Sequence, residues 1–260
     1  MNERSEVRGG AATTDQLGTG ARFDWGLAGA AELGHSCAAL VVVDVLSFTT
    51  ALDVAVGRGI RVHPFPWGDQ AEEYANRLGA TVAVGRDALS RDRPWSLSPA
   101  SLMRAPVVAD LVLPSPNGSA ICAAAGASGT PVIAACLRNA AAVVRWLKMS
   151  GYGGVDRPVG VIASGERWPD GTLRPCVEDL LGAAAVLDGL SDAPGRLSVE
   201  AAVTLAALAA VPDPIAAVRG CVSGRELVAR GFGADVDVAV ATNVSTTVPM
   251  IEHGAFTNVG

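Results

Sequence analysis

The chain has 260 residues, of which half are hydrophobic and only 5% are aromatic, so it can bury a substantial core in one large domain or two small ones. Its formal net charge of −6, without any block of Lys and Arg, argues against nucleic acid or an anionic membrane as a partner. No segment approaches the roughly 18 consecutive apolar residues of a membrane span, and we expect a cytoplasmic protein.

The first 20 residues mix charged residues, Gly and Thr without periodicity. Apolar burial cannot offset the entropy of ordering such a segment, and its polar character does not fit a signal peptide. We therefore expect a disordered leader over residues 1–20. A single domain is expected over residues 21–260, because no low-complexity linker marks a boundary inside it.

The first clear element is an almost continuous apolar segment over residues 38–45. Its length and its β-branched residues predict a strand that is buried on both faces. It is followed by Ser47, Thr49 and Thr50, whose hydroxyls can cap a helix that reaches about Gly57. The pattern is a strand, a polar turn and a helix.

The same alternation recurs along most of the chain. The predicted pairs of strand and helix are residues 61–65 with 69–78, 110–113 with 117–125, 131–135 with 139–148, and 158–163 with 177–190. A short strand over residues 81–84 precedes a loop rich in Pro and Ser over residues 90–99. Broken helices are expected over residues 198–230 and a last strand over residues 236–241, whereas the tail from Thr247 shows no definite element. This order predicts an α/β fold, with three α/β/α layers around a mainly parallel or mixed sheet.

Asp44 lies near the end of the first apolar segment. A carboxylate there is costly unless it is paired, bound to a metal or emerging at the edge of the sheet. Ligands of open α/β sheets collect beyond the carboxyl ends of the strands, which makes Asp44 a candidate functional residue. The alternative is that Asp44 only caps the following turn through Thr49 or Thr50, which needs no cofactor.

A second polar turn, over residues 113–119, ends another predicted strand and starts a helix. The first amides of that helix could hold an oxyanion such as a phosphate or a sulfonate. Asn117, Gly118 and Ser119 are then candidates for substrate binding. Turn chemistry alone explains the same residues equally well, since Pro, Asn and Gly commonly form turns.

Acidic residues gather after the strand predicted over residues 158–163. Glu166 follows in a loop, and Glu178 and Asp179 begin the next helix. Paired carboxylates suit a hard cation such as Mg²⁺, which prefers oxygen ligands. Acidic residues in a first helical turn also complement the helix dipole, so a purely structural role stays open.

A further polar pair follows the strand predicted over residues 131–135. Arg138 could neutralise an acidic substrate and Asn139 could orient it by hydrogen bonding. Arg138 could equally pair with Glu166.

Taken in chain order, these segments resemble the 2-phosphosulfolactate phosphatase family, in which a D-V-L-R-A-T-T-like strand end precedes N-G-[ST] and E-D motifs. The likeness extends over residues 23–249. The segments that carry it are Asp44-Val-Leu-Ser-Phe-Thr-Thr50, Asn117-Gly-Ser119, Leu137-Arg-Asn139, Ala163-Ser-Gly165, Glu178-Asp-Leu-Leu-Gly-Ala183 and Val248-Pro249.

The resemblance implies a three-layer α/β/α fold and Mg²⁺-dependent hydrolysis of 2-phosphosulfolactate, or of a similar small phosphorylated acid, to the hydroxy acid and phosphate, as in coenzyme M biosynthesis. The metal would be held by Asp44, Glu178 and Asp179. The predicted catalytic residues are Asp44, Glu166 and Arg138. The predicted substrate-binding residues are Thr49, Thr50, Asn117, Gly118, Ser119 and Asn139. The partner would be a small anionic phosphorylated substrate, and a homodimer is compatible with the sequence.

Departures from the family pattern bear on activity. Ser47-Phe48 stands where the family usually has Arg-Ala, which removes a guanidinium able to grip phosphate. Gly85-Arg86 replaces a Gly-Glu pair, and Ser96-Leu-Ser-Pro99 replaces a G-N-S-P-like loop. Two alternatives follow from these changes. One is a related phosphatase with another small phosphorylated acid as substrate, and the other is a catalytically silent homologue that binds a small anion or has a regulatory role.

Overall fold

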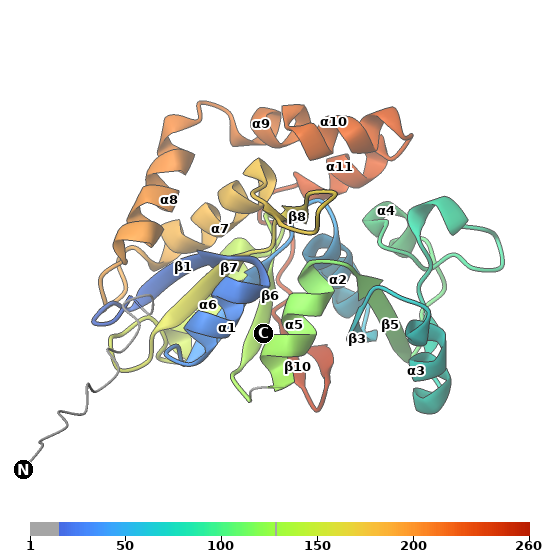
Figure 1. The fold of residues 1–260 in the computed structure, drawn as a ribbon, viewed down its shortest axis with the longest axis horizontal. Helices are drawn as coiled ribbons and strands as arrows, with labels where there is room; N and C mark the ends of the chain where they lie inside the picture. The colour runs from blue at the N-terminus through green and yellow to red at the C-terminus, as the bar shows by residue number, and fades with distance from the viewer. Residues whose placement is uncertain (1–15, 128) are drawn as a thin grey trace, which may run out of the picture.

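The computed structural model describes residues 16–127 and 129–260. Residues 1–15 of the expected leader therefore lie outside the described residues. In the described part of the chain, nine strands form one mixed sheet in the order β1-β7-β2-β6-β10-β11-β3-β5-β4, and the separate hairpin β8-β9 lies outside it. Figure 1 shows the sheet with its covering helices. This arrangement confirms the predicted α/β fold with a mixed sheet.

Strands and helices alternate along most of the chain. The strands are β1 (Ala21–Trp25), β2 (Ala39–Val43), β3 (Arg61–Pro66), β4 (Thr81–Val82), β5 (Asp110–Ser115), β6 (Val132–Ala135), β7 (Val159–Ala163), β8 (Glu166–Arg167), β9 (Leu173–Arg174), β10 (Pro249–Glu252) and β11 (Ala255–Asn258). The α-helices are α1 (Gly26–Gly34), α2 (Phe48–Gly57), α3 (Gln70–Leu78), α4 (Pro99–Leu102), α5 (Gly118–Ala127), α6 (Ala140–Met149), α7 (Val177–Leu190), α8 (Val199–Ala210), α9 (Pro214–Gly220), α10 (Val222–Ala229) and α11 (Gly233–Ala239). A short 3-10 helix, η1, spans Arg86–Ala88.

The sheet consists of two parallel sets of strands joined by a hairpin. One set contains β1, β7, β2 and β6, and the other contains β3, β5 and β4. Between them lie β10 and β11, which pair antiparallel with each other, with β6 and with β3. The residues from 249 to 258, for which the sequence indicated no definite element, therefore lie in the middle of the sheet.

Strand β2 is the centre of the three layers, and all of its side chains are buried. Val41 and Val43 belong to the core on one face, which α6 and α7 cover. Leu40 and Val42 belong to the core on the other face, together with side chains of α1, α2 and α5. Because successive side chains of a strand point to opposite faces, an uninterrupted apolar strand needs a helical layer on each side.

The prediction of a strand over residues 236–241 is wrong, because this segment lies mostly in α11. Its valines favour a strand locally. Asp235, Val236 and Ala239 are nevertheless buried together on one helical face, and α11 packs against α10 and α4. Tertiary packing therefore overrides the local preference.

Between α7 and β10 the chain forms four helices, of which α9, α10 and α11 lie together near the β8–β9 hairpin (Figure 1). Within the described residues, no single helix has both the length and the apolar character needed to cross a membrane. Helices α8 and α9 satisfy that test only jointly, and they are bent by 93° relative to each other.

Candidate active site

A pocket of about 360 Å³ opens where the segments after β2 and β7 meet η1, the start of α7, and α10. Its lining is rich in charges of both signs. The carboxylates are Asp44, Glu166, Glu178, Asp179 and Glu226, and the arginines are Arg86, Arg167, Arg174 and Arg230. We call this site the carboxylate pocket. It can receive a cation and an anion side by side, because each finds opposite charges there.

Asp44 is held rigidly just beyond the end of β2. Its Oδ1 accepts a hydrogen bond from Phe48 N at 3.1 Å, and its Oδ2 accepts one from Gly118 N at 3.1 Å. A side chain at position 118 would place its Cβ only 2.5 Å from that Oδ2. The N-G-S turn after β5 therefore needs glycine at this position, because only glycine lets the backbone amide approach Asp44 closely.

Asp179 connects the ends of the two neighbouring strands β2 and β7. It lies in the first turn of α7, and its carboxylate accepts hydrogen bonds from Val45 N at 2.8 Å and Gly165 N at 2.9 Å. Helix α7 approaches β2 closely because Gly182 has no side chain, since a Cβ there would lie 2.5 Å from Val45. The packing of α7 thus brings a second buried carboxylate into the pocket that contains Asp44.

Burial and mutual repulsion make this pair of carboxylates electrostatically unfavourable. Burial raises the pKa of Asp44, and the nearby carboxylate of Glu166 raises it further. Burial also raises the pKa of Asp179 strongly, followed by the charges of Asp44 and Glu178. The backbone donors act in the opposite direction in both cases but do not cancel the effect. A bound cation would relieve this repulsion.

Glu166 and Asn117 form a direct contact between the loops after β7 and β5. Asn117 Nδ2 donates to Glu166 Oε2 at 2.7 Å. Burial raises the pKa of Glu166, and the hydrogen bond from Asn117 opposes that rise. The amide therefore fixes one oxygen of a carboxylate whose pKa is raised.

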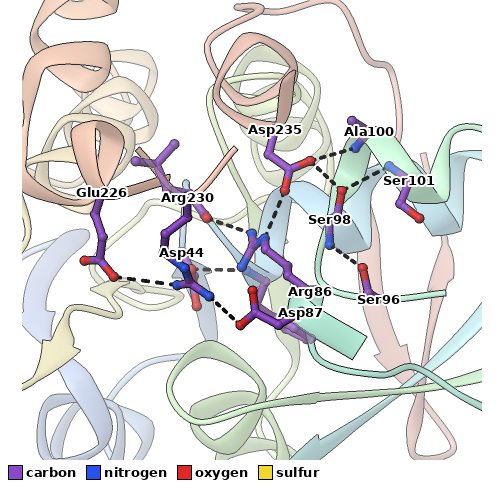
Figure 2. A network of polar contacts seen from close by, with 12 residues as sticks. Asp44, Arg86, Asp87, Ser96, Ser98, Ala100, Ser101, Glu226, Arg230 and Asp235 are labelled. Atoms are coloured by element: carbon purple, nitrogen blue, oxygen red, sulfur yellow. Dashed lines mark hydrogen bonds and ion pairs between the residues drawn. The ribbon is translucent and has the colours of Figure 1, made fainter. Parts of the chain in front are cut away.

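None of the four arginines of the pocket was among the predicted site residues; Arg86 and Arg230 are the two that lie outside the β8–β9 hairpin. Figure 2 shows both in a polar network that joins η1 to α10 and α11. Arg86 Nε donates to Asp235 Oδ2 at 2.9 Å, and Arg230 donates to Asp87 at 2.8 Å. The only signal in the sequence was the Arg that replaces a Glu at position 86, because Asp235 is 149 residues away along the chain.

Arg138 and Asn139, predicted to contact substrate, lie outside the carboxylate pocket. Arg138 forms a buried ion pair with Asp53, with Nε 2.8 Å from Oδ2, and not with Glu166. Asn139 is fully buried, where its Oδ1 accepts from Cys136 N at 2.8 Å and its Nδ2 donates to Thr247 O at 3.1 Å. Both residues therefore stabilise the loop after β6 rather than face a ligand.

The three predicted hydroxyl contacts to substrate are also used within the fold. Thr49 Oγ1 donates to Asp44 O at 2.7 Å, and Thr50 Oγ1 donates to Val45 O at 2.6 Å. Ser119 Oγ bonds to backbone atoms of Phe65 and Leu113. All three side chains are buried, so they shape the turns that carry Asp44 and Gly118 and are not available to a substrate.

The residues of the pocket fit a hard divalent cation by their chemistry. The described residues contain no group of three or more His, Cys, Asp or Glu side chains already placed around a common point. Mg²⁺ commonly uses only one or two carboxylates and completes its coordination with water and substrate phosphate. Asp44 and Asp179 each retain lone pairs beyond their two backbone hydrogen bonds, and a cation could use these lone pairs.

Comparison with known proteins adds an independent finding. A family model described as 2-phosphosulpholactate phosphatase matches residues 29–254. No curated protein matches the chain. The matched range includes every residue of the carboxylate pocket.

Proposed function

The chain belongs to the 2-phosphosulpholactate phosphatase family, and we propose that it hydrolyses 2-phosphosulfolactate or a similar small phosphorylated acid with Mg²⁺ as cofactor. The products are the hydroxy acid and phosphate. The observation that carries this proposal is the pair of buried carboxylates, Asp44 and Asp179, in a pocket that also contains four arginines. Phosphate monoesters and Mg²⁺ together need this combination of charges.

Asp44 and Asp179 would hold the cation, with Glu178 beside them in the same pocket. When bound, Mg²⁺ supplies Lewis acidity that polarises a phosphoryl oxygen and counters developing charge. The protein fixes both carboxylates in advance, because each accepts two backbone hydrogen bonds. This preorganisation lowers the cost of assembling the site.

Glu166 would take a proton from an attacking water. Its Oε2 is fixed by Asn117, and no hydrogen bond joins its Oε1 to another described residue. A carboxylate whose pKa is raised by burial is a stronger base than an exposed one, which favours proton abstraction from water. Asn117 thereby orients the base, and the arginines neutralise the anionic substrate.

The test is phosphate release from 2-phosphosulfolactate and from a panel of phosphorylated small acids, with and without Mg²⁺. Wild-type protein should release phosphate only with the metal, and Asp44→Asn should reduce turnover by at least about 100-fold. Asp237→Asn is the matched control, because Asp237 is exposed on α11 and lies outside the pocket. Turnover that is indifferent to both metal and Asp44→Asn would refute the assignment. Binding of phosphorylated acids without turnover would instead identify a silent anion-binding homologue.

A further inference from the structure

Arg86 is more buried than Arg230 and Arg167, two other arginines of the carboxylate pocket. Its side chain is only 11% exposed, whereas that of Arg230 is 44% exposed. Arg167 and Arg174 lie on the β8–β9 hairpin, outside the main sheet. A guanidinium that is removed from water binds an anion more strongly than an exposed one, because solvent screens it less.

The orientation of Arg86 is fixed by a chain of hydrogen bonds (Figure 2). Its Nε donates to Asp235 at 2.9 Å, and its Nη2 donates to Leu46 O at 3.2 Å. Asp235 is itself held, because Ser98 Oγ donates to its Oδ1 at 2.6 Å. The guanidinium also faces Asp44, whose charge it partly offsets (Figure 2), and a guanidinium has five N–H donors in all. The hydrogen bonds from Nε and Nη2 therefore fix the guanidinium, and its remaining N–H groups can donate to a ligand.

From these observations we propose that Arg86 is the residue that grips the phosphoryl oxygens of the substrate, and that Asp235 positions it. The inference rests on the proposed function of the pocket, because it names the anion-binding group for the same reaction. Arg86 lies close enough to Asp44 for its charge to act on that carboxyl. A phosphate held by Arg86 would therefore lie beside the carboxylates that are proposed to hold Mg²⁺.

The position of Ser47 supports this reading. Ser47 and Arg86 line the same pocket, and Arg86 bonds to the carbonyl of Leu46, which immediately precedes Ser47. A guanidinium at position 47 or at position 86 would therefore reach the same pocket.

The experiment measures the affinity of the Mg²⁺-loaded protein for inorganic phosphate, the reaction product, by calorimetry, together with steady-state turnover. Arg86→Ala should weaken phosphate binding by roughly 10- to 100-fold, as expected for a lost charge-assisted contact. Arg86→Lys keeps the charge but not the planar fork and should give an intermediate loss. The double variant Ser47→Arg with Arg86→Ala should recover part of the affinity.

Asp87→Ala is the matched control for a structural effect. It removes the ion pair between Asp87 and Arg230, which joins η1 to the end of α10, just as the pair of Arg86 and Asp235 joins η1 to α11. Asp87 itself does not line the pocket. Phosphate affinity should stay within about twofold of wild type in this variant. The proposal is overturned if wild-type protein binds no phosphate, or if Arg86→Ala binds phosphate as tightly as Asp87→Ala does.

The role of Asp235 needs a readout that a general loss of stability would not produce. Asp235→Asn should weaken phosphate binding in the wild-type background but cause no further loss in the Arg86→Ala background. Equal losses in both backgrounds would remove Asp235 from the proposal. If no substrate is hydrolysed but Arg86→Ala still abolishes phosphate binding, the hydrolytic function fails while the assignment of Arg86 stands. If hydrolysis proceeds unchanged in Arg86→Ala, the assignment of Arg86 fails alone.

Discussion

Gly118→Ala is the sharpest test of the geometry around Asp44. The added Cβ would lie 2.5 Å from Asp44 Oδ2 and 3.0 Å from the Cβ atoms of Asp44 and Phe48. An ordinary contact needs roughly 3.5 Å, so the carboxylate must move by about 1 Å or the α5 terminus must shift. Either movement breaks the hydrogen bond from Gly118 N to Asp44.

The magnitude of the effect differs between stability and activity. Overpacking one methyl group should lower the free energy of unfolding by about 1–3 kcal/mol, which most domains tolerate. A catalytic group displaced by about 1 Å loses on the order of 100-fold in rate. We therefore expect Gly118→Ala to be folded but nearly inactive and to have weakened Mg²⁺ affinity.

The assay combines thermal unfolding, Mg²⁺ titration by calorimetry and phosphate release. Gly220→Ala is the control, because a Cβ at that position meets no atom within 4 Å, and it should match wild type in turnover and Mg²⁺ affinity. If Gly118→Ala keeps wild-type turnover and Mg²⁺ affinity, the position of Asp44 is not critical and the reasoning fails. Loss of more than about 3 kcal/mol would equally contradict the local nature of the clash.

Three further predictions follow from other contacts. Arg138→Ala should lower the free energy of unfolding by about 3–5 kcal/mol, because it leaves the buried Asp53 without its ion-pair partner. Calorimetry should show that the folded variant binds phosphate as tightly as wild type. A selective loss of phosphate binding would instead assign Arg138 to the site. Mg²⁺ at about 100 times its Kd should stabilise wild type by about 2.7 kcal/mol in thermal unfolding. The same concentration should not stabilise Asp179→Asn. Equal stabilisation of both proteins would exclude Asp179 as a ligand. Asp110→Asn should lose on the order of 1 kcal/mol at pH 7 in urea unfolding. The hydrogen bond from Arg61 lowers the pKa of Asp110, helped by His63. The native carboxylate therefore stabilises the fold above its unfolded pKa, and this stability is lost as pH falls through the lowered folded pKa. If Asp110→Asn is less stable than wild type by the same free energy of unfolding at pH 2–3 as at pH 7, the ionised carboxylate is not the cause.

The sequence predicted which strand ends contribute to the carboxylate pocket. Asp44, Asn117 and Glu166 each follow a strand, and such strand ends are where ligands bind in α/β sheets. The carboxylates of α7 were found for the same reason. These residues converge because β2 and β7 are neighbours and because Gly118 N reaches Asp44.

The sequence could not predict contacts between segments that are far apart. Arg86 and Asp235 have no common local pattern, and Arg138 looked like a substrate-binding residue because its partner Asp53 lies on α2, 85 residues earlier. The hydroxyls of Thr50 and Ser119 looked available, since nothing in the sequence shows that nearby carbonyls accept from them. Such roles are set by tertiary packing, which local composition does not encode.

The place of the β10–β11 hairpin has a consequence for how the protein is made. The hairpin is synthesised after every other strand of the sheet, yet it is the piece that joins the two parallel sets. While the ribosome is still translating, β6 and β3 each present an unpaired row of backbone amides and carbonyls, which is the kind of edge that recruits other chains. Final assembly of the sheet must therefore wait until β10 and β11 have been synthesised, and we expect the nascent chain to be most prone to aggregation before that point.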